Sequence, residues 1–127
     1  MELYFPTELP EQLAFVAAGI VALIGLFTML FPAPLLRAGG FTTGKVGAEG
    51  FGATRSTGGL HLGLGLAALA LAQDFTYLML GIGLAFGALG RLLSVFLDRG
   101  TTGRNLLVLV LQLGLAGLPL GYVFGYF

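Results

Sequence analysis

Three polar side chains interrupt the long apolar runs of this chain, and their types are ones that bind anions or move protons. They are His61, Arg91 and Gln112, and the charged residues Glu49 and Arg55 precede His61. A guanidinium group binds carboxylate and phosphate oxygens through several N–H donors, and the set also suits a quinone-like oxygen. An imidazole can gain or lose a proton near neutral pH. Ionisable groups inside a membrane span are costly and mark candidate functional sites.

The elements that must position these side chains are four apolar runs, each near the length of a membrane span. About 20 apolar residues cross the hydrocarbon core, and the sequence predicts spans over residues 13–31, 53–72, 75–97 and 105–127. Composition agrees, because 57% of the 127 residues are hydrophobic and only 9% are charged. We therefore predict an all-α fold, an antiparallel four-transmembrane-helix bundle that forms a single integral membrane domain over residues 1–127.

The three polar side chains share one depth in this arrangement. At about 1.5 Å per residue, His61, Arg91 and Gln112 each lie roughly 9–10 Å from the same end of the bundle. The period of a helix gathers small or weakly polar residues on the stripe of His61, namely Thr54, Thr57, Gly58, Gly65, Ala68 and Ala72. The stripe of Arg91 contains Tyr77, Gly81, Leu84, Gly87, Ser94 and Asp98. A bundle turns such stripes inward, so we expect a polar layer with Glu49 and Arg55 at its mouth.

Two interpretations of this polar layer stay open. In the first, Glu49, Arg55, His61, Arg91 and Gln112 line a ligand-binding pocket. In the second, they form a satisfied structural cluster, where Arg91 pairs with a carboxylate or snorkels to the interface, His61 binds a carbonyl and Gln112 bridges two helices.

The basic residues predict the orientation in the membrane. All six Lys and Arg residues fall in or beside the first and third connections, as Arg37, Lys45, Arg55, Arg91, Arg99 and Arg104. Basic residues mark the cytoplasmic connections of membrane proteins. We therefore expect both of these connections in the cytoplasm and both termini outside.

Glycines supply the close helix contacts that packing in lipid requires, because lipid provides no hydrophobic drive between helices. The chain has 22 glycines, and several repeat at intervals of four. The candidates for helix packing are Gly58, Gly59, Gly63, Gly83, Gly87, Gly117, Gly121 and Gly125. Packing within one bundle is one interpretation, and a ridge that makes a homo-oligomer or binds a partner membrane protein is the other.

Composition also excludes several classes of function. The chain has no cysteine and a single histidine, so we predict no metal site and no cofactor. The formal net charge is zero, which argues against a nucleic-acid partner. No serine, histidine and aspartate set is arguable from one His, so we assign no catalytic residue.

The segment Arg55-Ser56-Thr57-Gly58-Gly59-Leu60-His61-Leu62-Gly63-Leu64-Gly65 resembles a family of bacterial four-helix membrane proteins known as domain of unknown function 4345. Glu49, the Gly90-Arg91 pair and the proline-ended first helix are similar too, so the resemblance covers nearly the whole chain. This chain differs from the family at Thr57, where members of the family are expected to have an aromatic residue. The resemblance implies a four-helix fold, a bacterial inner membrane and a role for Glu49, Arg55, His61 and Arg91, and it implies no reaction.

These observations lead to one expected function and two alternatives. We expect an uncharacterised small integral membrane protein that acts as a binding or accessory subunit. Its cytoplasm-side polar layer would hold an anionic membrane lipid, a small acid or a partner helix. The first alternative is a small oligomeric transporter or proton-coupled carrier. The second is a membrane enzyme that uses His61 as acid or base, although the chain offers no obvious nucleophile, so the residues favour a non-enzymatic role.

Overall fold

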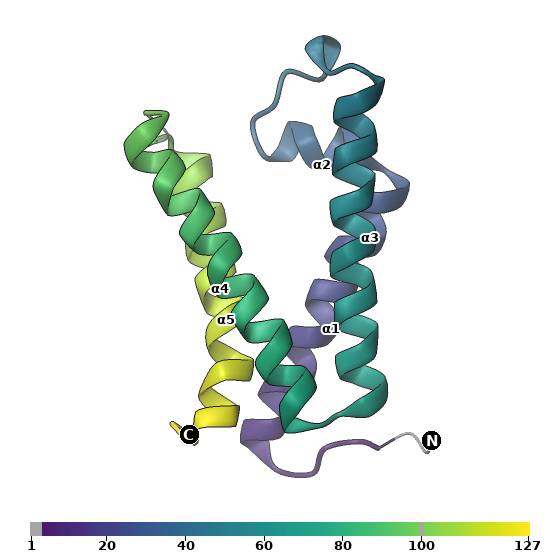
Figure 1. The fold of residues 1–127 in the computed structure, drawn as a ribbon, viewed down its shortest axis with the longest axis vertical. Helices are drawn as coiled ribbons and strands as arrows, with labels where there is room; N and C mark the ends of the chain where they lie inside the picture. Colours follow the sequence, from purple (N-terminus) through teal and green to yellow (C-terminus); the bar gives the residue numbers. More distant parts are fainter. Residues whose placement is uncertain (1–3, 100) are drawn as a thin grey trace.

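A computed structural model describes residues 4–99 and 101–127, and every regular element within them is helical (Figure 1). The elements are α1 (Leu9–Leu30), α2 (Pro32–Ala38), the 3-10 turn η1 (Thr43–Lys45), α3 (Ala48–Leu71), α4 (Asp74–Leu97) and α5 (Gly103–Phe124). The prediction of an all-α fold is therefore confirmed for this part of the chain. Four of the helices are long, and α2 is a short additional helix in the first connection.

Three of the long helices, α1, α4 and α5, are long and apolar enough to cross a membrane. The predicted span over residues 53–72 is helical and belongs to α3, but α3 does not reach the same hydropathy. The physical reason is its composition, because Arg55, His61 and many glycines stand where the other helices carry large apolar side chains. By its three apolar helices, the chain belongs to the class of membrane-embedded helical proteins.

The helices form two pairs that meet at one end of the molecule and diverge toward the other (Figure 1). The helix α1 packs mainly against α3, α4 packs against α5, and α1 also contacts α5. The N-terminal segment, the turn between α3 and α4 and the C-terminus lie together, and we call this the terminal end. The helix α2 and the connection from α4 to α5 lie at the opposite end, which we call the loop end.

The buried core lies in the half of the molecule near the terminal end. Its residues come from all four long helices and are mostly small or aliphatic: Ala14, Ala18, Val21, Ala68, Tyr77, Leu80, Leu84 and Ala116. The helices converge here because alanine permits close approach, and Tyr77 and Leu80 fill the remaining space. Toward the loop end the two pairs separate, and the long helices there contribute few buried residues.

Glycine and alanine bring α1 and α3 into backbone contact. A Cβ atom built on Gly58 would lie 2.6 Å from Met29 N and 2.7 Å from Gly25 O. One built on Gly65 would lie 2.8 Å from Ala18 O. The buried residues of α3 are Gly58, Gly65 and Ala68, which all belong to the stripe predicted to face inward. The small side chains therefore determine how closely this pair can pack.

Proline residues set both ends of α1. The helix begins at Leu9, four residues before the predicted start, because Pro10 stands in the first turn, where its missing N–H breaks no helical hydrogen bond. It ends at Leu30, and the following Pro32 is the first residue of α2. The chain therefore changes direction at this point, and the short helix α2 forms within the first connection.

The turn between α3 and α4 contains a strained alanine. Ala72 ends α3 in the left-handed conformation, with φ 47° and ψ 46°. This conformation costs an L-residue other than glycine roughly 1–2 kcal/mol. Gln73 caps the start of α4, and the Thr76 hydroxyl donates a hydrogen bond to the Gln73 carbonyl at 2.8 Å. The short turn therefore holds α3 and α4 antiparallel at the expense of backbone strain.

We expect Ala72→Gly to raise the free energy of unfolding by about 1 kcal/mol, because glycine adopts this conformation without the Cβ clash. Unfolding by sodium dodecyl sulfate in mixed micelles, followed by circular dichroism, measures the change. The matched control is Ala67→Gly inside α3, which should lower stability by up to about 1 kcal/mol. Equal losses in both variants would contradict the role assigned to Ala72.

Candidate functional site

Arg91 is the predicted site residue with the most fully defined surroundings. Its Nε donates a hydrogen bond to Gln112 Oε1 at 2.8 Å, and its Nη1 donates one to Asn105 Oδ1 at 2.8 Å. The two acceptors are seven residues apart on α5, which places them on the same face two helical turns from each other. The guanidinium group is therefore held by two side-chain amides between α4 and α5.

Among the described residues, no ion pair neutralises the charge of Arg91. Both of its acceptors are uncharged amides, and no carboxylate of the described residues lies in an ion pair with it. The side chain is half-buried, and Asp98 on the same stripe is exposed. A fixed, partly desolvated cation without a carboxylate attracts anions strongly, because its charge is only weakly screened by water.

Arg55 has a structural role in this fold. Its Nη1 donates hydrogen bonds to Met29 O at 2.8 Å and to Leu30 O at 3.3 Å. These carbonyls end α1 and have no partner inside the helix, so a cation there satisfies them and interacts favourably with the helix dipole. Glu49 stands exposed in the first turn of α3, where a negative charge is likewise favourable.

His61 lies on the other helix pair. Its side chain is half-buried on α3, and its main chain belongs to the close contact with Gly25 of α1. No hydrogen bond joins His61 to Arg91 or Gln112 in the described part of the chain. The structure therefore brings Arg91 and Gln112 together and places His61 with α1, because the two helix pairs diverge at this level (Figure 1).

Asn105 completes the Arg91 cluster and was not among the predicted site residues. It stands near the start of α5, where the Thr102 hydroxyl accepts a hydrogen bond from its backbone N–H at 3.2 Å. The seven-residue spacing between Asn105 and Gln112 is visible in the sequence. A polar residue at the edge of a predicted span is easily taken for one that faces the membrane–water interface. Asn105 instead accepts a hydrogen bond from Arg91 of the neighbouring helix.

Three of the glycines predicted for helix packing approach another helix. Gly58 makes the backbone contact with α1 described above. A Cβ atom on Gly59 would lie 3.4 Å from Met29 Sδ, and one on Gly87 would lie 3.6 Å from Gln112 Nε2. Both are contacts with side chains, which can adjust.

The remaining five glycines of that set have other surroundings. The ring of Phe127, from the C-terminal segment, covers Gly121. Gly125 ends α5 with φ +75°, a conformation that favours glycine. At four of these glycines, a Cβ atom would meet nothing within 4 Å apart from the nearby backbone of its own helix. They are Gly63, Gly83, Gly117 and Gly125. Among the described residues, Gly117 and Gly125 of this repeat therefore do not approach another helix.

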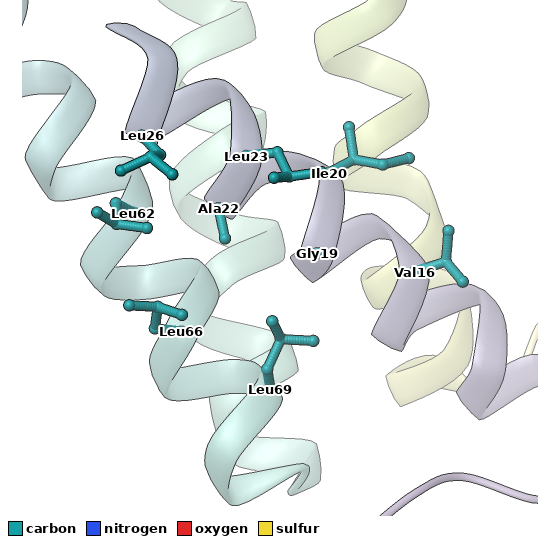
Figure 2. Close-up of a pocket in the computed structure, with 9 residues that line it drawn as sticks. All are labelled: Val16, Gly19, Ile20, Ala22, Leu23, Leu26, Leu62, Leu66 and Leu69. Carbon is teal, nitrogen blue, oxygen red and sulfur yellow. The ribbon is translucent and has the colours of Figure 1, made fainter. Parts of the chain in front are cut away.

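An apolar groove lies along α1 and α3 (Figure 2). It has a volume of about 490 Å³ and is lined by Val16, Gly19, Ile20, Ala22, Leu23, Leu26, Leu62, Leu66 and Leu69. These side chains offer no hydrogen-bonding group that could orient a polar ligand. The groove suits hydrocarbon, and it is separate from the Arg91 cluster.

Several tyrosines and a glutamate toward the terminal end were not among the predicted site residues. The Tyr4 hydroxyl donates a hydrogen bond to Glu11 Oε2 at 3.1 Å, which raises the pKa of Tyr4. Tyr77 is fully buried nearby and packs edge-to-face on Tyr122. Tyr77 belongs to the stripe of Arg91 that was predicted to face inward, and it is buried in the core.

No family model, curated protein or solved structure matches this chain. The resemblance to the bacterial four-helix family therefore rests on its motif residues alone. The fold itself defines the class as a membrane-embedded helical protein with three apolar helices.

Proposed function

We propose that this protein crosses the bacterial inner membrane four times, with α3 as the fourth transmembrane helix. The close contact of α3 with α1 supports this arrangement, because α3 runs beside an apolar helix along its length. All six basic residues stand on the loop-end side of their helices or in the connections there, and the described part of the terminal end has none. The basic bias favours a cytoplasmic loop end and external termini.

We propose that the protein is a binding or accessory subunit that holds an anionic group at Arg91. The observation that carries this proposal is the guanidinium held by the amides of Gln112 and Asn105, with no carboxylate of residues 4–99 and 101–127 paired with it. Two neutral acceptors orient the cation and leave its charge for a ligand, such as a lipid phosphate or a small acid. Ionisable groups inside a membrane usually pair with one another or with backbone carbonyls, whereas the two described partners of Arg91 are neutral side-chain amides.

The basic surroundings of the loop end support the same ligand chemistry. Arg37, Lys45, Arg99 and Arg104 are exposed there, and Arg104 Nη1 donates a hydrogen bond to Arg37 O at 3.4 Å. Each basic residue near an anionic membrane surface contributes about 1 kcal/mol of attraction. These residues would concentrate anions at the membrane surface, and Arg91 would bind one of them inside the membrane.

The experiment is native mass spectrometry of protein purified in mild detergent and offered phosphatidylglycerol. We expect Arg91→Gln to weaken lipid binding about tenfold or more, because one charge-assisted hydrogen bond contributes about 1.5–3 kcal/mol. Arg91→Lys should keep part of the affinity, since the charge remains and the planar donor array is lost.

Arg99→Gln is the matched control, because Arg99 is exposed and lies outside the Arg91 cluster. It should lower affinity only slightly, and its loss should disappear at high salt. Equal losses in the Arg91 and Arg99 variants would show unspecific attraction to the basic end and would contradict the proposed site. Circular dichroism confirms that each variant is folded.

A further inference from the structure

The apolar groove along α1 and α3 lies on the same helix face as an exposed arginine. On α3, Leu62, Leu66 and Leu69 line the groove, and Arg55 stands seven residues before Leu62. Spacings of three, four and seven residues place side chains on one face of a helix, so Arg55 shares the face of the three leucines. Figure 2 shows these leucines beside the lining side chains of α1. The groove therefore has an apolar part and, beyond Leu62, a cationic end.

Gly59 keeps the surface between Arg55 and Leu62 low. It stands four residues after Arg55 and three before Leu62, so it belongs to the same face of α3. A Cβ atom built on Gly59 would come closest to the sulfur of Met29, at 3.4 Å. A methionine side chain is flexible and adapts to the groups around it. A hydrocarbon chain can therefore lie over Gly59 and continue into the groove.

Arg55 stands where the apolar part of α1 ends. Its Nη1 donates hydrogen bonds to Met29 O and Leu30 O, and Leu30 is the last residue of α1, a helix apolar enough to cross a membrane. The side chain is exposed, and within residues 4–99 and 101–127 its hydrogen bonds involve Nη1 alone. A guanidinium group has five N–H donors, and its Nε and Nη2 edge matches two oxygens of one phosphate. Arg55 therefore presents this edge to an anion at the level of the membrane interface.

The distance from Arg55 to the far end of the groove matches one leaflet of a bilayer. Leu69 follows Arg55 by fourteen residues, which corresponds to roughly 21 Å along a helix. Half of a bilayer, headgroups included, is about 20–22 Å thick. Leu66 and Leu69 also line a second apolar hollow, beside Phe15, so the far end of the groove has apolar surroundings. A phosphate at Arg55 would place the end of its acyl chain there.

The lining of the groove favours a lipid chain over a partner helix. Close packing between helices in lipid needs small residues at the contact. Valine, isoleucine and leucine supply most of this lining, and Gly19 and Ala22 are the small residues among the described ones. The volume of about 490 Å³ falls within the range of small-molecule sites, roughly 300–1,000 Å³. A hydrocarbon chain fits such a groove, and a phosphate complements the charge at its end.

We propose that the α1–α3 groove binds one phospholipid, with the phosphate at Arg55 and one acyl chain along Leu62, Leu66 and Leu69. The phosphate oxygens accept hydrogen bonds from Nε and Nη2 of Arg55, while Nη1 keeps the two carbonyls at the end of α1. This site goes beyond the anion site proposed at Arg91, which lies between α4 and α5. Either site can exist without the other, so the two proposals are tested separately.

The test is photo-cross-linking in phosphatidylglycerol nanodiscs that contain a small fraction of the same lipid with a diazirine at the end of one acyl chain. Mass spectrometry of the digested protein locates the labelled residues. We expect labelling of Val16, Leu66 and Leu69 about tenfold above that of exposed residues of α4 at the same depth, because a charge-assisted hydrogen bond changes affinity about tenfold or more. Uniform labelling of all exposed faces overturns the proposal, since it shows only ordinary contact with bilayer lipid.

Two variants act on the two parts of the site. Arg55→Gln removes the charge and keeps a donor for the end of α1. Gly19→Leu fills the groove without changing Arg55, and a Cβ atom at Gly19 would meet nothing within 4 Å apart from nearby backbone of its own helix. Each variant should lower groove labelling to the level of the exposed residues of α4. Unchanged labelling in either variant, with the fold verified by circular dichroism, overturns the proposal.

Gly83→Leu is the matched control for Gly19→Leu. Gly83 is exposed on α4, outside the groove, and a Cβ atom there also has space. This variant should leave groove labelling unchanged. An equal loss of labelling in Gly83→Leu and Gly19→Leu would show a general effect of the added leucine and would contradict the site.

Two further measurements separate this proposal from its neighbours. Arg91→Gln should weaken phosphatidylglycerol binding in native mass spectrometry and leave groove labelling unchanged, so either site can fail alone. A second copy of the chain is the competing occupant of the groove. Because the chain has no cysteine, a single Leu23→Cys variant reports on this contact. Disulfide-linked dimers of this variant, together with an unlabelled groove in the parent, overturn the lipid site and identify a second copy as the occupant.

Discussion

Gly65→Ala is expected to lower the free energy of unfolding by about 2 kcal/mol, because the added methyl group has no space between α1 and α3. A Cβ atom at this position would lie 2.8 Å from Ala18 O and 2.8 Å from Ala22 N. Both are backbone atoms of a regular helix and cannot rotate away. The helices α1 and α3 must therefore move apart, which weakens their other packing contacts as well.

Gly63→Ala is the matched control for this prediction. Gly63 lies on the same helix and is exposed, and a Cβ atom there would meet nothing within 4 Å outside the helix's own backbone. Alanine is also the better helix former by up to about 1 kcal/mol, so this variant should be neutral or more stable. Detergent unfolding of both variants, followed by circular dichroism, measures the difference. A loss of similar size at Gly63 would mean that glycine flexibility, and not close packing, stabilises α3.

Tyr77→Ala is expected to lower the free energy of unfolding by about 3 kcal/mol or more, as for other large-to-small substitutions in a core. Tyr77 is among the largest fully buried side chains and packs beside Leu80, Leu84 and Tyr122, where the two helix pairs converge. Its removal leaves a cavity at this junction. We also expect looser contact between the two helix pairs. Faster amide hydrogen exchange in the halves of α1 and α4 nearest the terminal end would show this.

Two further variants separate the causes of that loss. Tyr77→Phe keeps the ring and removes a hydroxyl that has no partner among the described residues, so it should be as stable as the parent or more stable. Phe75→Ala removes an aromatic ring from the same turn of α4, but Phe75 is 71% exposed and should cost far less. If Phe75→Ala and Tyr77→Ala destabilise the protein equally, the assigned junction is not the source of the effect.

Much of the helical structure was predictable because it depends on local properties of the chain. Apolar runs and prolines indicate helices and their ends, and all four predicted spans overlap long helices of the fold. The prediction overestimated how apolar α3 is. Arg55, His61 and its glycines make it less apolar than α1, α4 and α5. The short helix α2 was missed, because a connection rich in glycine and proline predicts a loop.

The candidate sites were less predictable because they depend on which helices become neighbours. His61, Arg91 and Gln112 were predicted to share one layer because they lie at equal depth along their helices. Depth does not determine which helices pack against each other. Arg91 meets Gln112 and Asn105 because α4 packs on α5, whereas His61 stays with α1. Tyr77 meets Tyr122 because α4 packs on α5, and no spacing in the sequence relates these two rings.

The sequence by itself determined the helical class, the C-terminal end of α1, the inward stripe of α3 and the placement of all basic residues in or beside two connections. Each of these follows from side-chain type and spacing along the chain. The tertiary structure alone decided the order of packing, the divergence toward the loop end and the partners of Arg91, Arg55 and Tyr77. The physical reason is that packing in a membrane depends on close fit between small residues on different helices. Such a fit depends on two helix surfaces together, so the pattern of residues along one helix cannot predict it.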